Sequence, residues 1–246
     1  MRYGELTYSE IRERAEAGWL AVIPLGSIEQ QGPHLPVDFD TWFVQTLTEA
    51  AADLAAREYG VNALVLPAIP FAPTSEHRNF LSGFVHLPAK LHQALIYAVL
   101  RSICEQGFAR MVLWNGYTKH DLDGVIAQFN AEHAGRANVF LPNVPYQTIW
   151  SQVGDPEIPG GHADSFTTSL ALFLRPETVR ADRIAAPRSK PVNWRDPGLD
   201  LARHTNTGVV GDPTHSSAEL GQRLWDATVQ MAALLLKDAT QISLSA

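Results

Sequence analysis

Four short apolar runs divide the chain, and each is separated from the next by a polar segment and a stretch with helical spacing. The runs cover residues 20–25, 63–66, 111–114 and 139–141. Continuous apolar runs of this length are typical of parallel strands that are buried on both faces of a sheet. The pattern therefore predicts four buried strands.

Helices are predicted between and after these strands. Thr7 and Glu10 have the spacing of a capping box, which predicts a helix from this point to about Ala17. Five further helices are expected, at about 40–58, 89–106, 121–133, 162–174 and 217–237. In the second of these five, helical spacing predicts one buried face, made by Leu91, Leu95, Ala98, Val99 and Ile103.

The order of these elements predicts the fold class. Strands alternate with helices, no repeat is visible and no linker divides residues 1–246, so we expect one α/β domain with a mostly parallel sheet. Long irregular segments are expected at 26–39, 67–88 and 176–213. Ligands of such sheets bind at the carboxyl ends of the strands, which directs attention to the loops after Leu25, Leu66 and Trp114.

Titratable residues are concentrated in these loops. They are Glu29, His34, Asp38 and Asp40 in the first loop, Glu76 and His77 in the second, and Tyr117, Lys119, His120 and Asp121 in the third. His162 and Asp164 lie at a predicted helix N-terminus, where backbone N–H groups favour anions. Each has an ordinary structural interpretation, such as helix capping by Asp40, but their convergence on one sheet edge predicts a catalytic or binding pocket.

Composition and charge exclude several classes of protein. Of the 246 residues, 46% are hydrophobic and 18% are charged, which is enough apolar mass for a sizeable core. The net charge of −7, without a basic cluster, argues against nucleic acid or an anionic membrane as partner. Cys104 has no partner for an internal disulfide, and neither a signal peptide nor a membrane span is expected, so a cytoplasmic protein is predicted.

Several motifs together resemble the creatininase (creatinine amidohydrolase) family. The longest is PLGSIEQQGPHLPVDFD at 24–40, which is similar to the family signature PLGS-x-EQHGPHLP-x-x-x-D. Further similarities cover nearly the whole chain: SEH at 75–77 with Phe80 and Gly83, WNG at 114–116, GHAD at 161–164 with Thr168 and Ser169, and GVVGDP at 208–213 with Glu219 and Gly221.

The resemblance implies a three-layer α/β sandwich with a mostly parallel central sheet, assembled as a homo-oligomer, commonly a hexamer. It also implies a site with two divalent metals, usually zinc, manganese or iron. Members of the family hydrolyse C–N bonds of small molecules, such as the cyclic amide of creatinine, and one branch trims a modified peptide. Two metals suit this chemistry because together they activate a bridging water and polarise the amide carbonyl.

The chain departs from the family at the metal ligands themselves. Two carboxylates that the resemblance identifies as ligands are present, Glu29 and Asp40. Glutamine, neutral tyrosine and lysine are poor ligands for a cation, and two carboxylates do not balance the charge of two dications. A normal dinuclear centre is therefore not expected, because ligand positions of the family are taken by Gln31, Tyr117, Lys119, Ser165 and Thr167.

Three interpretations follow from these substitutions. In the first, the pocket works without metal: Lys119 replaces the lost cation beside Glu29 and Asp40, and neighbouring groups act as acid and base, namely His34, Tyr117, His120 and His162. In the second, Glu29 and Asp40 hold one metal, completed by His120 or His162. In the third, the protein is a catalytically inactive binding or scaffold subunit.

The leading hypothesis is an enzyme that acts on a small polar molecule with an amide, lactam, amidine or related C–N bond. Hydrolysis is the first expectation, with elimination or cyclisation as alternatives. Glu29 serves as general base if burial raises its pKa, and Tyr117 or Lys119 polarises the substrate carbonyl.

Overall fold

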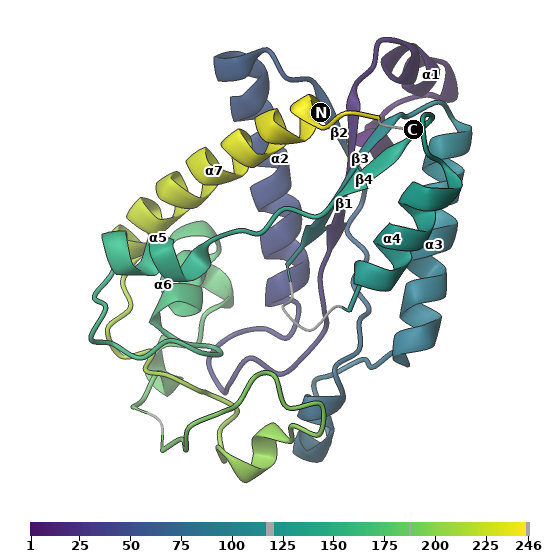
Figure 1. Ribbon diagram of the computed structural model, residues 1–246. Coiled ribbons are helices and arrows are strands. Elements are labelled where there is room, and N and C mark those ends of the chain that lie inside the picture. The colour runs from purple at the N-terminus through teal and green to yellow at the C-terminus, as the bar shows by residue number, and fades with distance from the viewer. Residues whose placement is uncertain (117–120, 187, 245–246) are drawn as a thin grey trace.

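A parallel sheet forms the centre of the molecule in the computed structural model, which describes residues 1–116, 121–186 and 188–244 (Figure 1). Every pairing in the sheet is parallel, in the order β2-β1-β3-β4. The four predicted strands are thereby confirmed, as β1 (Leu20–Leu25), β2 (Ala63–Val65), β3 (Arg110–Asn115) and β4 (Asn138–Phe140).

Helices cover both faces of this sheet, so the predicted three-layer α/β sandwich is confirmed (Figure 1). One outer layer contains α2 (Phe39–Tyr59), α5 (Tyr146–Val153), α6 (Ser165–Leu174) and α7 (Ala218–Gln241). The other contains α1 (Tyr8–Glu16), α3 (Ala89–Glu105) and α4 (Asp123–Glu132).

Alternation along the strands explains the two cores. Val22 and Val112 point into the core under α2 and α7, whereas Ala21, Ile23 and Leu113 point into the core under α3 and α4. Successive strand residues face opposite sides of a sheet, so a strand covered on both sides must be apolar throughout. This is why the strands could be found as continuous apolar runs.

Five short 3-10 helices were not predicted, and four of them lie in the segments 67–88 and 176–213 that were expected to be irregular. They are η1 (Tyr3–Glu5), η2 (Ser75–Phe80), η3 (Pro176–Thr178), η4 (Ala181–Arg183) and η5 (Leu201–Arg203). Helix α5 was not predicted from the sequence either, because it is short and lies close after two prolines, Pro142 and Pro145.

The predicted buried face of α3 was right at Ile103, which is buried, and in part at Val99, but wrong at its other three residues. Leu91 and Leu95 are 56% and 38% exposed, and Ala98 is exposed as well. A second stripe with equally good helical spacing packs on the sheet instead: His92, Ile96, Leu100, Ile103 and Cys104. Spacing alone does not choose between two such stripes.

Two helix starts are set by capping side chains. The capping box of Thr7 and Glu10 is present at α1, as predicted. Helix α6 starts later than expected, at Ser165, because the carboxylate of Asp164 accepts the backbone N–H of Thr167 at 3.1 Å. His162 therefore lies before the helix and not within it.

The carboxyl ends of the central strands approach each other closely. The N–H of Gly116 donates to the carbonyl of Leu25 at 2.8 Å, and a Cβ on Gly116 would lie 2.9 Å from that oxygen. Glycine is thus required where β1 and β3 end together. Within the described ranges, no helix has both the length and the apolar character needed to cross a membrane.

Candidate active site

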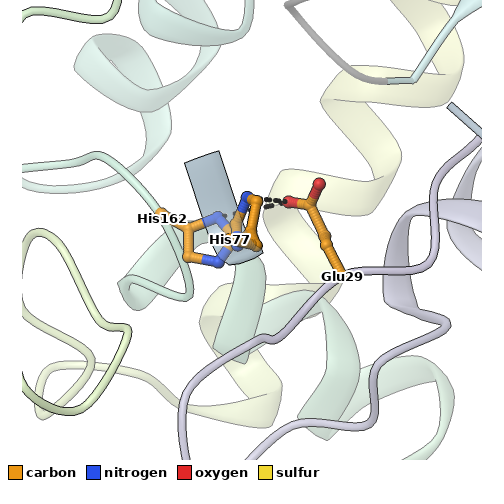
Figure 2. Close-up of side chains that lie close together, drawn as sticks. All are labelled: Glu29, His77 and His162. Atoms are coloured by element: carbon orange, nitrogen blue, oxygen red, sulfur yellow. Dashed lines mark ion pairs between the residues drawn. The ribbon is translucent and has the colours of Figure 1, made fainter. Parts of the chain in front are cut away.

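A buried carboxyl and two imidazoles meet at this end of the sheet. Oε1 of Glu29 lies 3.5 Å from Nε2 of His77 and 3.5 Å from Nδ1 of His162. Figure 2 shows both rings directed toward the same carboxyl oxygen of Glu29, with dashed lines for the two ion pairs. The ring centroids are 5.1 Å apart.

Each of the three residues comes from a different segment. Glu29 belongs to the loop after β1, where its N–H donates to the carbonyl of Val37. His77 lies on η2, in the long segment after β2. His162 is held by two backbone hydrogen bonds to Val210, of 2.7 and 2.9 Å.

Ala163, directly after His162, has φ of 52°, a left-handed conformation that non-glycine residues rarely adopt. The backbone is therefore strained at the point where it turns from this ring into α6.

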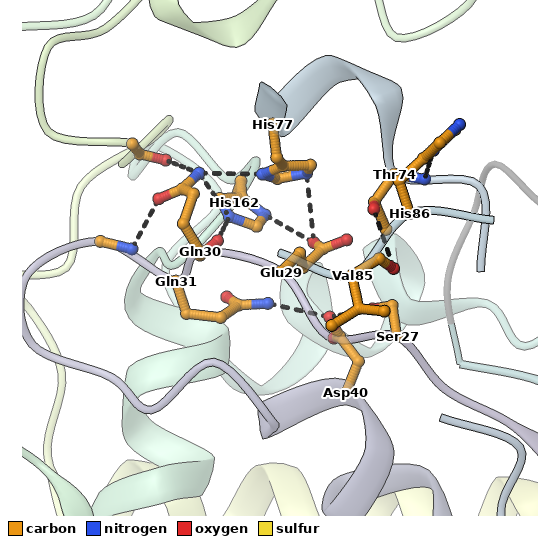
Figure 3. A network of polar contacts seen from close by, with 12 residues as sticks. Ser27, Glu29, Gln30, Gln31, Asp40, Thr74, His77, Val85, His86 and His162 are labelled. Carbon is orange, nitrogen blue, oxygen red and sulfur yellow. Dashed lines mark hydrogen bonds and ion pairs between the residues drawn. The ribbon is translucent and has the colours of Figure 1, made fainter. Parts of the chain in front are cut away.

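Asp40 lies in the first turn of α2 and does not cap that helix. Its Oδ2 accepts hydrogen bonds from the hydroxyl of Ser27 at 2.9 Å and from the amide of Gln31 at 2.8 Å (Figure 3). The N-cap position belongs to Asp38, whose side chain makes no capping hydrogen bond. The hydrogen bonds of Asp40 therefore point toward the site and away from the helix backbone.

Glu29 and Asp40 both hold protons more tightly than ordinary carboxyls. Burial raises the pKa of Glu29 well above its usual value, and the negative charges of Asp40 and Glu76 raise it further. Burial also raises the pKa of Asp40 to about 7, although hydrogen bonds from Ser27 and Gln31 oppose this shift. Near neutral pH the pair therefore keeps a proton that ordinary carboxyls would have lost.

Burial also favours the neutral form of two histidines, His162 and His34. It lowers the pKa of His162, against a hydrogen bond with the carbonyl of Gln30 that raises it. It lowers the pKa of His34 to about 4, with a smaller contribution from the charge of His162. His34 lies apart from the Glu29 carboxyl, and its Nε2 is 2.8 Å from the hydroxyl of Thr168 on α6.

Of the remaining predicted residues, some lie beside the site and others lie away from it. Glu76 is buried next to His77, and Asp38 forms an ion pair with Arg175 at 3.6 Å. Asp121 is exposed just before α4. Tyr117, Lys119 and His120 lie outside the described residues, so their proposed roles stay predictions.

Sequence reasoning missed one residue near Asp40. The hydroxyl of Tyr146, on the unpredicted helix α5, is buried beside Trp114, and both burial and the charge of Asp40 raise its pKa. No pattern near residue 146 indicated this position, because a short helix after two prolines carries little periodicity.

The polar groups around Asp40 do not fit a dinuclear metal centre. Gln31 directs an N–H donor at the carboxylate that would bridge two metals, and a donor repels a cation. The hydroxyl of Ser165 donates to the carbonyl of Asp212 at 2.6 Å, away from the carboxyl pair.

A different set has the residue types of a single-metal site. Glu29, His77 and His162 each offer a ligand atom within 4.8 Å of the others. Two histidines and one glutamate are a known zinc ligand set, provided that each metal-facing nitrogen carries a lone pair. Asp40, which was expected to share a metal with Glu29, is not part of this set.

Comparisons with known proteins agree with this architecture. The family model for creatininase, described as creatinine amidohydrolase, matches residues 4–236. A mycofactocin precursor peptide peptidase of Mycobacterium ulcerans (strain Agy99) is 32% identical over 235 residues, covering 90% of this chain and 86% of the relative. The creatinine amidohydrolase of Pseudomonas putida is 26% identical, covering 92% of each chain.

Solved structures show the same fold. A crystal structure of creatinine amidohydrolase (creatininase) superimposes with a TM-score of 0.77 at 24% identity, over 98% of this chain and 98% of that one. The fold and the site together therefore define the class of this protein: a parallel α/β protein with a carboxylate-rich site at the carboxyl ends of its strands. The chain belongs to the creatininase family.

Proposed function

We propose that this protein hydrolyses a C–N bond of a small polar amide or lactam, with Glu29 and Asp40 as the acid–base pair. It is a creatininase-family hydrolase, and its relatives are named for action on creatinine or on a precursor peptide. The substitutions at metal-ligand positions favour acid–base chemistry over two-metal chemistry for this chain.

One observation carries the proposal: two carboxyls at the sheet edge retain a proton near neutral pH. Glu29 is 1% exposed, and the pKa of Asp40 is about 7, so one group can be ionised while its neighbour is protonated. An ionised carboxylate and a protonated carboxyl are the base and the acid that hydrolysis of an amide requires.

The reaction proceeds in three proton transfers. Glu29 takes a proton from a water molecule as the water oxygen bonds to the carbonyl carbon, which gives a tetrahedral intermediate. Asp40 then donates its proton to the nitrogen as the C–N bond breaks, which gives a carboxylic acid and an amine, and the proton held by Glu29 passes to Asp40 to restore the starting state. Oε2 of Glu29 suits the first transfer because it makes no hydrogen bond to the described residues.

Polarisation of the substrate carbonyl is the second requirement. The developing oxyanion needs a hydrogen-bond donor or a positive charge. We assign this role to Tyr117 or Lys119, which follow β3 closely in the sequence. His34, His120 and His162 stay candidates for shuttling protons in this reaction.

A small polar substrate, a homo-oligomeric assembly such as a hexamer and a cytoplasmic location complete the proposal. The acidic composition, with a net charge of −7, supports a partner that is neither nucleic acid nor membrane. Light scattering that gives a concentration-independent monomer contradicts the assembly.

The experiment compares Glu29→Gln and Lys119→Ala with the wild type on a panel of lactams, primary amides, N-formyl compounds and peptide amides. Protein is treated with chelator first, so that bound metal does not contribute. We expect kcat/KM of Glu29→Gln to fall by about 10²–10⁴, with substrate binding retained. Glu58→Gln, an exposed carboxylate on α2, is the matched control and should change nothing.

Two outcomes contradict the proposal. Full activity in both site variants places the chemistry elsewhere. Saturable binding of a panel compound without turnover, in wild type and Glu29→Gln alike, identifies a binding protein instead.

A further inference from the structure

The side chain of Gln30 is held in one unambiguous orientation. Its Oε1 accepts the backbone N–H of Gly32 at 3.0 Å, and its Nε2 donates to the backbone carbonyl of Gly208 at 3.2 Å. A backbone N–H only donates and a backbone carbonyl only accepts, so the two ends of this amide cannot be interchanged.

This orientation determines where the proton of His77 lies. Nε2 of Gln30 is 3.1 Å from Nδ1 of His77, and an amide nitrogen can only donate. Nδ1 is therefore the acceptor, the ring is neutral and its proton is on Nε2. That nitrogen is the one facing Oε1 of Glu29 at 3.5 Å, so His77 presents a donor to the carboxyl.

The backbone of Gln30 determines the second ring in the same way. Nε2 of His162 lies 2.7 Å from the carbonyl oxygen of Gln30, a contact that requires an N–H on the ring. The Gln30 amide nitrogen also lies 3.3 Å from this ring nitrogen. This contact does not alter the assignment, because the two amide protons are already donated to Nδ1 of His77 and to the carbonyl of Gly208. The lone pair of His162 is then on Nδ1, which faces Glu29.

We propose that Gln30 is a positioning residue that fixes His77 as a hydrogen-bond donor and His162 as an acceptor toward Glu29. Oε1 of Glu29 thereby faces an N–H of His77 and a lone pair of His162, so it is the oxygen that carries the proton when Glu29 is protonated. A metal ion bound by the same three residues would need a lone pair on Nε2 of His77. That lone pair is absent, because the hydrogen bond from Gln30 to Nδ1 leaves the ring proton on Nε2. The network thus suits proton transfer and opposes metal binding at the site of the proposed function.

The fold provides a closely fitting cradle for this amide. A Cβ on Gly208 would overlap Oε1 of Gln30, and Gly208 has φ of 84°, so glycine is required there. Figure 3 shows the Gln30 amide between His77, His162 and the backbone, well apart from the Gln31–Asp40 contact. Four segments distant in sequence are therefore shaped around one side chain.

The test reads the tautomers directly. In protein labelled with ¹⁵N-histidine, long-range ¹H–¹⁵N NMR distinguishes a protonated ring nitrogen from a bare one, and single His→Gln variants assign the signals. We expect both His77 and His162 to carry their proton on Nε2. A proton on Nδ1 of His77 in the wild type overturns the proposal.

A variant tests the consequence for metals. Gln30→Glu retains the shape and offers His77 an acceptor, so the proton moves to Nδ1 and Nε2 becomes available. We expect Co²⁺ and Zn²⁺ to bind this variant about 10–100-fold more tightly than the wild type. Gln222→Glu, which adds the same charge at an exposed position of α7, should leave metal affinity unchanged.

Stoichiometric metal binding that is equally tight in the wild type and Gln30→Glu overturns the proposal. If Gln30→Glu does not fold, the wild-type spectrum decides the question by itself. No substrate is needed, so the expected tautomers in a protein that hydrolyses no amide would contradict the proposed function and leave the role of Gln30 intact.

Discussion

The amide of Gln31 and the hydroxyl of Ser27 both donate to Oδ2 of Asp40, at 2.8 and 2.9 Å. In the family pattern the position of Gln31 carries a histidine ligand, and the aspartate bridges two metals. Here a pair of hydrogen-bond donors occupies the same side of the carboxylate. The aspartate is therefore satisfied by the protein itself.

This contact predicts the metal content of the protein. After saturation with zinc, manganese or iron and removal of free ions, elemental analysis should find fewer than two ions per chain, because donors replace ligands around Asp40. Gln31→His alone should not change this result, since Lys119 remains. Two tightly held ions per wild-type chain would show that the assignment is wrong.

Loss of the Gln31 donor should shift a pKa in a known direction. The hydrogen bond from Gln31 lowers the pKa of Asp40, which is about 7 with that bond in place. Gln31→Leu removes the bond, so the pKa rises, and the limb of the pH profile of kcat/KM that reports Asp40 should move to higher pH. Gln222→Leu, on the surface of α7, is the control. A shift to lower pH contradicts the network.

The raised pKa of Asp40 should also appear in stability. An unfolded aspartate titrates near its ordinary value, whereas the folded one titrates near 7, so the folded state binds the extra proton between about pH 4 and 7. The free energy of unfolding of the wild type therefore decreases as the pH rises through this window.

Asp40→Asn lacks this titration. We expect its free energy of unfolding, relative to the wild type, to improve by on the order of 1–3 kcal/mol between pH 4 and pH 8. Urea unfolding at the two pH values measures the change, with Asp226→Asn at an exposed position of α7 as control. A difference that is the same at both pH values would refute the assignment.

The cradle around Gln30 predicts a costly glycine substitution. Gly208→Ala combines a left-handed φ with a clash against Gln30, and we expect it to destabilise the protein by about 2–4 kcal/mol. Gly135 has a similar φ of 75° but nothing within 4 Å of a built Cβ, so Gly135→Ala isolates the backbone effect and should cost about 1 kcal/mol. If both variants lose the same free energy of unfolding, the predicted clash between residue 208 and the Gln30 side chain does not occur.

The strands were predictable because each is buried on both faces and so reads as a continuous apolar run. The orientation of α3 was not predictable from the sequence. Leu91 and Ile96 belong to two apolar stripes with equal helical spacing, and only packing on the sheet determines which stripe is buried. Helix α5 left no periodic signal. The single-domain division, the oligomeric state and the cytoplasmic location stay predictions.

Glu29 and Asp40 could be singled out from the sequence because their motif is long. His77 was noticed only as a titratable residue of a loop, and Gln30 only as a residue of the long motif. The role of Gln30 could not be predicted because it depends on which nitrogen of each ring it faces. That information exists only after residues from distant segments have met. The roles of Tyr117, Lys119 and His120 stay predictions.

The contacts of the Gln30 amide also have a consequence for the order of folding. They join residues that are 47, 132 and 178 positions apart in the sequence. Long-range contacts of this kind form late, because a large loop must close before they contribute. The residues of strands β1 to β4 are all synthesised well before residue 208. Until residue 208 has been synthesised, the contacts that orient the Gln30 amide between His77 and His162 are therefore incomplete.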